Sequence, residues 1–226
     1  MLALSEWRRT RYRSGKAMAM VEFVSAWLRG LERYDQGTYR HSVRTAKYLL
    51  QFIGYLGRPT ERAKYIYASA ALHDIGKLAV PQRILQKKGS LRRREDCDVK
   101  RHPKLAFEWM SLLREPDDLA KIPYLHHERW DGTGYPLGLR GAEIPYSVRL
   151  FSVIDVWEAM SVNRPYRCAV PQAAILGYIA RTSDSLFDPE VVEAFLRWRK
   201  RASGDSWAKL IYPPEHDLRK EKRFRL

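Results

Sequence analysis

Apolar residues recur at helical spacing along much of the chain. A period of three to four residues joins Val43, Ala46, Leu50 and Ile53, and Gly57-Arg58-Pro59 ends this run. Such a period places apolar side chains on one face of an amphipathic helix, and glycine and proline end such helices. The pattern therefore predicts a helix that stops before residue 57.

A second helix is predicted directly after this break. Thr60 is suited to cap its N-terminus. The apolar side of this helix would consist of Ala63, Ile66, Tyr67, Ala70 and Ala71.

The rest of the chain repeats this helical pattern around a glycine-rich loop. Pro103 suits the first position of one helix, and another is expected over about residues 117–129. The loop runs from Asp131 to Gly138 and extends to Pro145. Three more helices are expected, around the run Val148, Phe151, Ile154 and Ala159, after Pro171, and after Pro189. Alternating strand patterns are nearly absent, so we expect one all-α domain built as a helical bundle.

Composition and charge narrow the class of protein. The chain has 226 residues, of which 45% are hydrophobic and 30% charged, an ordinary globular balance. No run approaches 18 uninterrupted apolar residues, so no membrane span is expected. Cys97 and Cys168 show no CxxC spacing, which argues against a disulfide scaffold or zinc ribbon and fits a reducing, cytoplasmic location.

The net charge of +15 gathers at the two ends of the chain. Residues 1–20 contribute +4 and residues 197–226 contribute +6. Such tails can touch nucleic acid or anionic lipid, or can simply be solvated. Arg92-Arg93-Arg94 begins a further basic patch, which we interpret as an exposed face or a surface for a protein partner. No nucleic-acid fold motif accompanies it, so nucleic-acid binding is not expected as the main role.

Five of the six histidines form a sparse series with one histidine or pair for each predicted helix or helix end. They are His41, His73, His102, His126 and His127, and only His216 lies outside the series. Asp74 follows His73 directly, and Asp155 interrupts an otherwise apolar stretch. A single histidine on an apolar face is usually a hydrogen-bonded core residue. The set of seven is hard to satisfy that way, because buried carboxylates need a partner charge or a metal.

Imidazole and carboxylate together suit iron, manganese, zinc, cobalt or nickel. Seven candidate ligands are too many for one tetrahedral zinc ion, and they suit two metals that share a bridging ligand.

Two longer motifs resemble a known family. The sequence His73-Asp74-Ile75-Gly76-Lys77 resembles the HD metal-phosphohydrolase motif, and residues 126–136, HHERWDGTGYP, resemble the further motif of its HD-GYP subfamily. The resemblance continues at residues 155–160, DVWEAM, and 164–167, RPYR, and covers roughly residues 35–198. It implies residues 35–199 as the HD-GYP domain, between an N-terminal helical and basic segment, 1–34, and a basic C-terminal appendage, 200–226.

The resemblance implies an all-helical fold and the hydrolysis of cyclic di-GMP to linear pGpG and often on to GMP. It implies a centre of two or three metal ions, with Asp74 as the bridging carboxylate. Of these we expect two divalent ions, iron or manganese, because the donor set mixes imidazole and carboxylate. The metal ligands would be His41, His73, Asp74, His102, His126, His127 and Asp155. The matching substrate-binding positions are Lys77, Tyr135, Arg164 and Arg167.

The chemistry agrees with this resemblance. Two metal ions roughly 3.5–4 Å apart can hold a water as hydroxide near neutral pH for in-line attack on phosphorus. Lys77 lies about one helical turn after Asp74 and can offset charge on the phosphate or leaving group, so Asp74 and Lys77 are the candidate catalytic residues. Arg164 and Arg167 suit bidentate phosphate contacts or brace their loop. Tyr135 can stack on guanine, donate to a phosphate, or pack the loop.

Some family members have a glutamate four residues before the first histidine, which supports a third metal. Here that position is Gly37, and Asp35 would project roughly 240° around a helix from His41. Glu158 and Met160 replace the more usual aspartate and leucine, which we interpret as mild changes. Two alternatives remain open: another cyclic dinucleotide or nucleotide as substrate, or a non-enzymatic module that senses a dinucleotide or docks a partner. A homodimer is also possible.

Overall fold

The computed structural model describes residues 22–58, 63–111, 118–163 and 168–203. The regular structure among these residues is helical, with no strand beyond one isolated bridge between Ser183 and Phe187. Residues 22–34 form a first helix. The later elements are α2 (Gln36–Tyr55), α3 (Ala63–Ala71), η1 (Ile75–Ala79), α4 (Gln82–Leu85), α5 (Arg93–Lys100), α6 (His102–Ser111), α7 (Asp118–Leu125), η2 (Gly141–Glu143), α8 (Tyr146–Ser161), α9 (Gln172–Arg181) and α10 (Pro189–Ser203). The predicted all-α class is confirmed.

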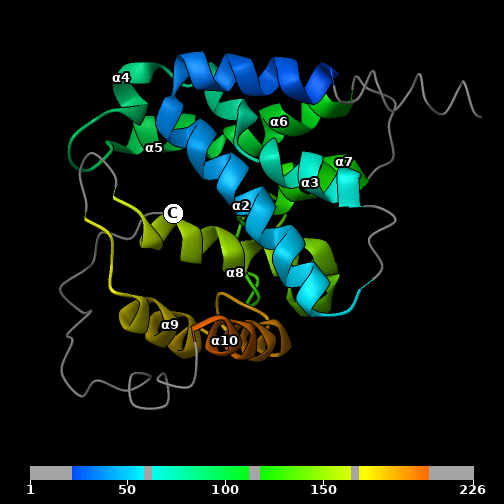
Figure 1. Cartoon of the computed structure of the whole chain (residues 1–226). Helices are drawn as coiled ribbons and strands as arrows, with labels where there is room; N and C mark the ends of the chain where they lie inside the picture. The colour runs from blue at the N-terminus through cyan, green and yellow to red at the C-terminus, as the bar shows by residue number, and fades with distance from the viewer. Residues whose placement is uncertain (1–21, 59–62, 112–117, 164–167, 204–226) are drawn as a thin grey trace, which may run out of the picture.

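The helices enclose two apolar clusters. The larger cluster lies among α2, α8, α9 and α10, with Phe52, Phe151 and Phe195 fully buried. The smaller cluster joins the helix of residues 22–34 to α3, α6 and α7. In Figure 1, α2 crosses the molecule diagonally in front of α8, while α9 and α10 lie together below it. This arrangement brings the middle of α2 against α8.

Local chemistry explains where α2 begins. The Asp35 carboxylate accepts hydrogen bonds from the backbone N–H of Gly37 at 2.9 Å and of Thr38 at 3.2 Å. These bonds satisfy N–H groups that the first helical turn leaves unpaired, as an N-cap does. Asp35 is thus a helix cap, and its carboxylate is engaged at the start of α2.

One helix end differs from the prediction. The helix expected over about residues 117–129 ends at Leu125 in the structure. Pro123 lies inside it and cannot donate a backbone hydrogen bond. Beyond Leu125, a Cβ on Gly134 would lie 2.4 Å from the Arg129 nitrogen, so the glycine-rich loop packs directly on the backbone of the loop segment that follows α7. Residues 126–129 therefore leave the helix to hold that loop.

The pattern also missed two short helices, α4 and α5. α5 buries none of its residues, so it has no apolar stripe to reveal it. At α6 the difference is small, because Pro103 is the second helical residue and not the first.

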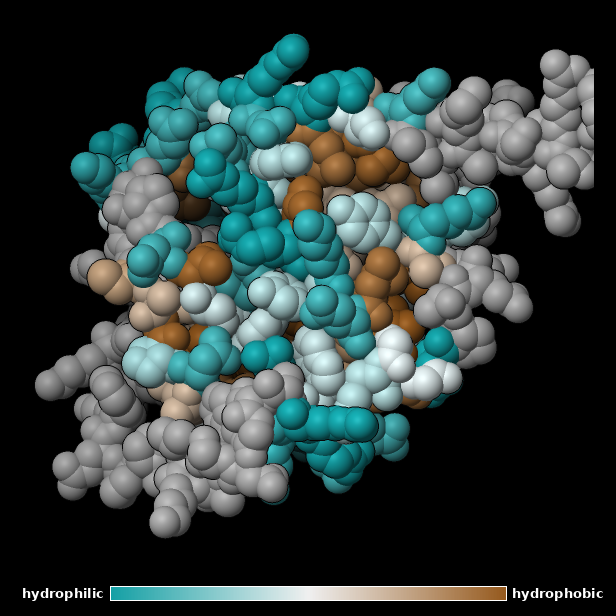
Figure 2. Space-filling view, in the orientation of Figure 1, coloured by the Kyte–Doolittle hydropathy of each residue, from teal (hydrophilic) through white to brown (hydrophobic). Residues whose placement is uncertain are grey.

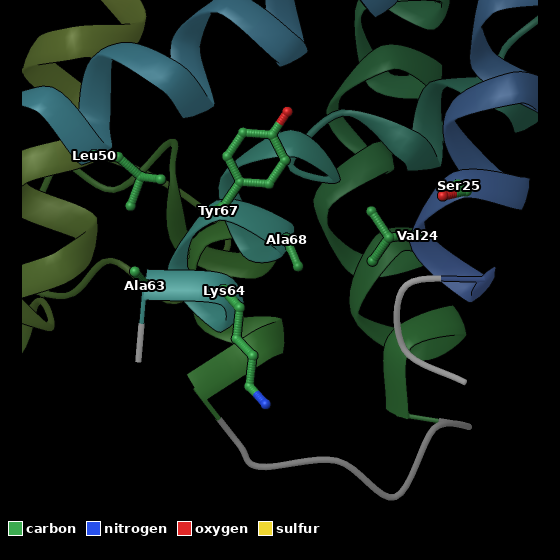
Figure 3. A pocket seen from close by; sticks show the side chains of 7 residues that line it. All are labelled: Val24, Ser25, Leu50, Ala63, Lys64, Tyr67 and Ala68. Atoms are coloured by element: carbon green, nitrogen blue, oxygen red, sulfur yellow. The ribbon is translucent and has the colours of Figure 1, made fainter. Parts of the chain in front are cut away.

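The surface is mixed in polarity, and hydrophilic side chains cover much of the face in Figure 2 with apolar patches between them. A cavity of about 300 Å³ opens between the helix of residues 22–34, α2 and α3, lined mainly by apolar atoms (Figure 3). None of the seven candidate ligands lines this cavity. Within the described residues, no helix is both long enough and apolar enough to span a lipid bilayer.

Candidate metal centre

The seven predicted ligands come from separate elements and meet inside the bundle. His41 lies on α2 and Asp155 on α8, while His73 and Asp74 lie in the turn between α3 and η1. His102 is the first residue of α6, and His126 and His127 follow the end of α7. Three overlapping groups form, each with ligand atoms within 4.8 Å of one another: His102, His126 and His127; His41, His73 and Asp155; and His73, Asp74 and His126.

The first half of the metal centre consists of His41, His73 and Asp155. Oδ1 of Asp155 lies 2.8 Å from Nε2 of His41 and 3.7 Å from Nε2 of His73. Both imidazoles are buried and stand nearly edge-on to each other, with ring centroids 5.3 Å apart. One carboxylate oxygen therefore faces two ring nitrogens, one from α2 and one from the turn after α3.

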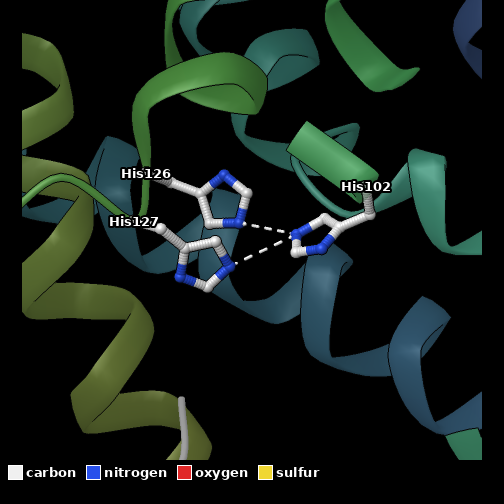
Figure 4. Close-up of side chains that lie close together, drawn as sticks. All are labelled: His102, His126 and His127. Carbon is white, nitrogen blue, oxygen red and sulfur yellow. Dashed lines mark hydrogen bonds between the residues drawn. The ribbon is translucent and has the colours of Figure 1, made fainter. Parts of the chain in front are cut away.

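The second half consists of three histidines (Figure 4). Nε2 of His102 lies 3.2 Å from Nε2 of His126 and 3.3 Å from Nε2 of His127. This half contains no carboxylate of its own in the group of three. It is therefore rich in nitrogen, whereas the first half mixes nitrogen and oxygen.

Asp74 lies between the two halves. Its Oδ1 lies 3.2 Å from Nε2 of His102, and its Oδ2 lies 3.2 Å from Nε2 of His73. Lys77 donates to the same Oδ2 at 2.6 Å, so this lysine is held against the centre and is not a solvated surface side chain. Asp74 thus has one oxygen toward each half, the position that a bridging ligand requires.

Gly76 permits this close assembly. A Cβ at that position would lie 1.9 Å from the backbone carbonyl oxygen of His102, a contact that no side chain can make. The glycine lets η1 approach the start of α6, which brings Asp74 and His102 together.

The hydrogen bonds at Nδ1 of two imidazoles leave their Nε2 atoms unprotonated inside the centre. Nδ1 of His102 lies 2.7 Å from the Val99 carbonyl oxygen, and Nδ1 of His126 lies 3.1 Å from that of Ile122. A carbonyl only accepts, so each Nδ1 is the donor and each Nε2 of the neutral rings carries a lone pair. Two lone pairs 3.2 Å apart repel. A cation between them removes this conflict, so the residues fit a metal ion.

The carboxylates support the same conclusion. Oδ1 of Asp74 and Oδ1 of Asp155 are buried without a hydrogen bond, although ring nitrogens lie close to both. Buried carboxylate oxygens are normally hydrogen-bonded or bound to a cation. Their donor set of imidazole and carboxylate suits a divalent transition metal.

Electrostatics separates the two halves further. Burial lowers the pKa of His126 to about 3, with help from the neighbouring His73 and His102. Burial also opposes charge on His41, but the neighbouring carboxylates of Asp155 and Glu158 outweigh it and raise the pKa of His41 to about 9. Although burial favours the neutral acid, the charges of His73 and Lys77 hold the pKa of Asp74 well below its usual range.

Two buried glutamates support the site and were not predicted from the sequence to do so. Glu158 lies behind His41, with Oε2 against Nδ1 of His41 and Oε1 against Nε of Arg44. Glu128 accepts hydrogen bonds from the backbone N–H of Leu137 at 2.7 Å and of Leu139 at 3.0 Å, and so fixes the glycine-rich loop. Both glutamates stand within the motifs, and the signal that could have found Glu158 is a charged residue inside the apolar run that predicts the helix around residues 148–159.

Tyr135 packs against the centre. Its ring stacks on that of His127, with centroids 4.6 Å apart and an interplanar angle of 18°. Nζ of Lys100 lies 5.7 Å from the Tyr135 ring centroid. Arg164 and Arg167, the other predicted substrate-binding residues, lie outside the described residues.

Comparison with known proteins gives the class. The family model described as "HD domain" matches residues 29–191, so the chain belongs to the HD-domain family. Its HDIGK and HHERWDGTGYP motifs, with the relatives below, place it in the HD-GYP subfamily.

Curated relatives share much of this chain. It is 38% identical over 180 residues to the cyclic di-GMP phosphodiesterase response regulator RpfG of Xanthomonas campestris pv. campestris, covering 79% of this chain and 48% of that protein. It is 35% identical over 171 residues to the 3′3′-cGAMP-specific phosphodiesterase 3 of Vibrio cholerae, covering 76% of this chain and 37% of that protein. The chain thus spans about half or less of the length of these relatives.

A solved structure shares the fold. Bd1817, an HDG"Y"P protein from Bdellovibrio bacteriovorus, superposes with a TM-score of 0.61 at 18% identity, covering 84% of this chain and 63% of that one. At this identity the likeness concerns the fold alone. It agrees with the all-α HD fold of the chain.

Proposed function

We propose that the chain is a metal-dependent phosphodiesterase that hydrolyses cyclic di-GMP to linear pGpG, with GMP as a further product. The observation that carries the proposal is the meeting of His41, His73 and Asp155 with the three histidines around Asp74. Five histidines and two carboxylates in a buried site are costly for folding, and a phosphoryl-transfer centre gives them a purpose. The relatives named as cyclic di-GMP phosphodiesterases support the substrate.

The metal ligands that we propose are the seven converging residues, with Asp74 as the bridge. When bound, divalent ions supply Lewis-acid polarisation of a phosphoryl oxygen and a water of lowered pKa. We propose two ions, iron or manganese, because the donor set mixes imidazole and carboxylate. A third ion would need another acidic ligand near the start of α2, where Gly37 has no side chain and Asp35 caps the helix.

The chain's own residues bind and orient the substrate around this centre. The Lys77 ammonium, held by Asp74, offsets the charge that builds up on the phosphate and the leaving oxygen. His127 stacks on one face of the Tyr135 ring, and the phenol hydroxyl is the group of this side chain that could donate a hydrogen bond to a phosphate. Arg164 and Arg167 are proposed to bind the substrate phosphates through planar, bidentate guanidinium contacts.

The second candidate substrate is 3′3′-cGAMP, on account of the Vibrio cholerae relative of that specificity. No guanine contact separates the two dinucleotides in the described residues. A protein partner at the basic surface, a homodimer and a cytoplasmic location remain predictions.

The test combines metal analysis with product chromatography. Protein purified without oxygen would be analysed for metal and incubated with cyclic di-GMP, 3′3′-cGAMP and cyclic di-AMP, with His216→Ala as a matched histidine control. We expect two ions per chain, fastest cleavage of cyclic di-GMP, and no loss in the control.

Other outcomes would contradict parts of the proposal. Faster cleavage of another dinucleotide would overturn the substrate. Metal-loaded protein that binds cyclic di-GMP without cleaving it would indicate a sensing module. Three fully occupied metal sites would refute the inference from Gly37, and a single site would refute the bridged centre.

A further inference from the structure

His41 is held differently from its neighbours in the centre. Nδ1 of His73, His102 and His126 each lies against a backbone carbonyl three or four residues earlier in the chain. Nδ1 of His41 instead contacts the Glu158 carboxylate, which lies 117 residues away on another helix. In the described residues, His41 is the candidate ligand whose rear nitrogen meets a carboxylate.

Two carboxylates of α8 contact the two nitrogens of this imidazole. Asp155 faces Nε2 of His41 at 2.8 Å, and Glu158, one helical turn later, faces Nδ1. Residues three apart on a helix lie on the same face, so the two carboxylates can hold one ring between them. An ionised carboxylate only accepts, so the Glu158 contact keeps a proton on Nδ1. Nε2 is then the nitrogen that faces the metal centre, and any proton that it carries beside Asp155 in the metal-free protein leaves when an ion binds.

Arg44 completes the arrangement. It lies three residues after His41 on α2, and its Nε contacts the second oxygen of Glu158. Glu158 is 1% exposed, whereas the Arg44 side chain is 37% exposed, so the pair brings a charge from the surface to a buried carboxylate. Without Arg44, that carboxylate would have the imidazole as its one polar partner among the described residues.

We infer that Glu158, aimed by Arg44, is a positioning residue that fixes the His41 ring with Nε2 toward the metal centre. This inference rests on the proposed metal centre and adds residues to it that do not touch the ions. Carboxylates behind ligating histidines orient the ring and raise its basicity, and their loss weakens metal binding. The ion bound by His41, His73 and Asp155 should therefore depend on Glu158 more than the ion bound by the three histidines does.

The experiment measures metal affinity and needs no turnover. Wild type, Glu158→Gln and Arg44→Gln would be equilibrated with buffered Mn²⁺ and analysed for bound metal. Glu193→Gln, an exposed glutamate on α10, and Arg40→Gln, an exposed arginine one turn before Arg44, are the matched controls. Thermal unfolding of the metal-free proteins is the second measurement.

We expect Glu158→Gln to weaken the binding of one ion by about 10–100-fold and to leave the other nearly unchanged. Arg44→Gln should act in the same direction and less strongly, while both controls match wild type. The midpoint of metal-free unfolding should also fall, because each substitution breaks a buried ion pair, so the unequal loss of the two ions is the deciding result.

Two results would overturn the inference. Wild-type affinity for both ions in Glu158→Gln would show that the ring needs no carboxylate. A large drop in metal-free stability with unchanged Mn²⁺ affinity would make the contact an ordinary structural one. If Glu158→Gln does not fold, the same comparison of Mn²⁺ affinity and metal-free stability is made with Arg44→Gln, whose side chain is half-exposed. Wild-type protein that binds both ions and cleaves no dinucleotide would refute the phosphodiesterase proposal while leaving this test intact.

Discussion

The metal centre and the large apolar cluster are both buried against α8, and they are built in opposite ways. In the cluster, Phe52 packs edge-on to Phe195 and stacks on Trp198, with centroids 5.8 and 5.2 Å apart. Every such contact gains from the exclusion of water. In the centre, bare ring nitrogens face one another and buried carboxylate oxygens lack hydrogen bonds. In the absence of metal, the centre therefore destabilises the folded state, and burial of the apolar cluster offsets this loss.

Phe151 marks the boundary between the two regions. It belongs to the apolar cluster, and its ring lies 4.9 Å from the ring of His73. The ligands are thus held by packing that does not depend on the metal. Substitutions in the metal centre should therefore lower activity more than stability, and substitutions in the apolar cluster should do the reverse.

The largest expected effect is on activity, from His73→Ala or Asp74→Ala. Each removes a ligand, and Lewis-acid stabilisation is worth several kcal/mol, so cleavage should fall by at least about 10³-fold. Helicity should be preserved, because the apolar cluster is untouched. Product chromatography, circular dichroism and metal analysis measure the three quantities. Near wild-type turnover in a variant that lacks metal would show that the metal mechanism is wrong.

The converse change is Phe195→Ala in the apolar cluster. Removing this fully buried ring should lower the free energy of unfolding by about 3–5 kcal/mol. The cleavage rate per folded molecule should stay close to that of wild type. Urea denaturation and assays at low temperature test both halves of this statement. Loss of turnover in fully folded Phe195→Ala protein would show that the apolar cluster also determines activity, which contradicts the separate roles of the two regions.

The sequence predicted the ligands better than their supports. Five of the seven ligand residues stand in the HDIGK, HHERWDGTGYP and DVWEAM motifs, while His41 and His102 lie outside them. The structure brings all seven together, and their binding of metal stays a prediction. Helices with a clear apolar face, such as α2 and α8, were also predictable. α5 was not, because it buries no residue. The roles of Glu158 and Glu128 depend on tertiary contacts, and no local pattern shows that Glu158 would meet a histidine 117 residues away.

Lys77→Ala should have the next effect in size. Its ammonium lies against Asp74 and faces the centre, so its loss should cost about 2–4 kcal/mol of transition-state stabilisation if it acts on developing charge. The metals should remain bound, since Lys77 is not a ligand. Steady-state kinetics with parallel metal analysis measures this, and Arg164→Ala provides the comparison at a proposed phosphate-binding position. Unchanged kinetics in both variants would remove them from the substrate-binding set.

Removal of the metal should lower the stability of the folded protein, because the metal offsets the unfavourable burial of the ligands. A ligand that binds the folded state alone stabilises it by about 2.7 kcal/mol at a free concentration 100 times its dissociation constant. Wild type should therefore unfold at a lower temperature after chelation, and Asp74→Ala should show a much smaller difference. Calorimetry with and without Mn²⁺ gives both values. Equal midpoints for loaded and chelated wild type would mean that the centre carries no folding cost that a metal relieves.

The smallest effect is expected for Glu128→Gln, and it concerns a buried carboxylate that needs no metal. Both oxygens of Glu128 already accept backbone hydrogen bonds, from Leu137 and Leu139, in contrast to the unpaired oxygen of Asp74. Glutamine keeps one acceptor and leaves one buried N–H unpaired, at a cost of about 1–3 kcal/mol. The glycine-rich loop should loosen, which hydrogen exchange at the Leu137 and Leu139 amides would detect, while the metal content stays at the wild-type value. Loss of metal from this variant would mean that the loop and the centre form one unit, since Tyr135 then transmits the change to His127 through their stacked rings.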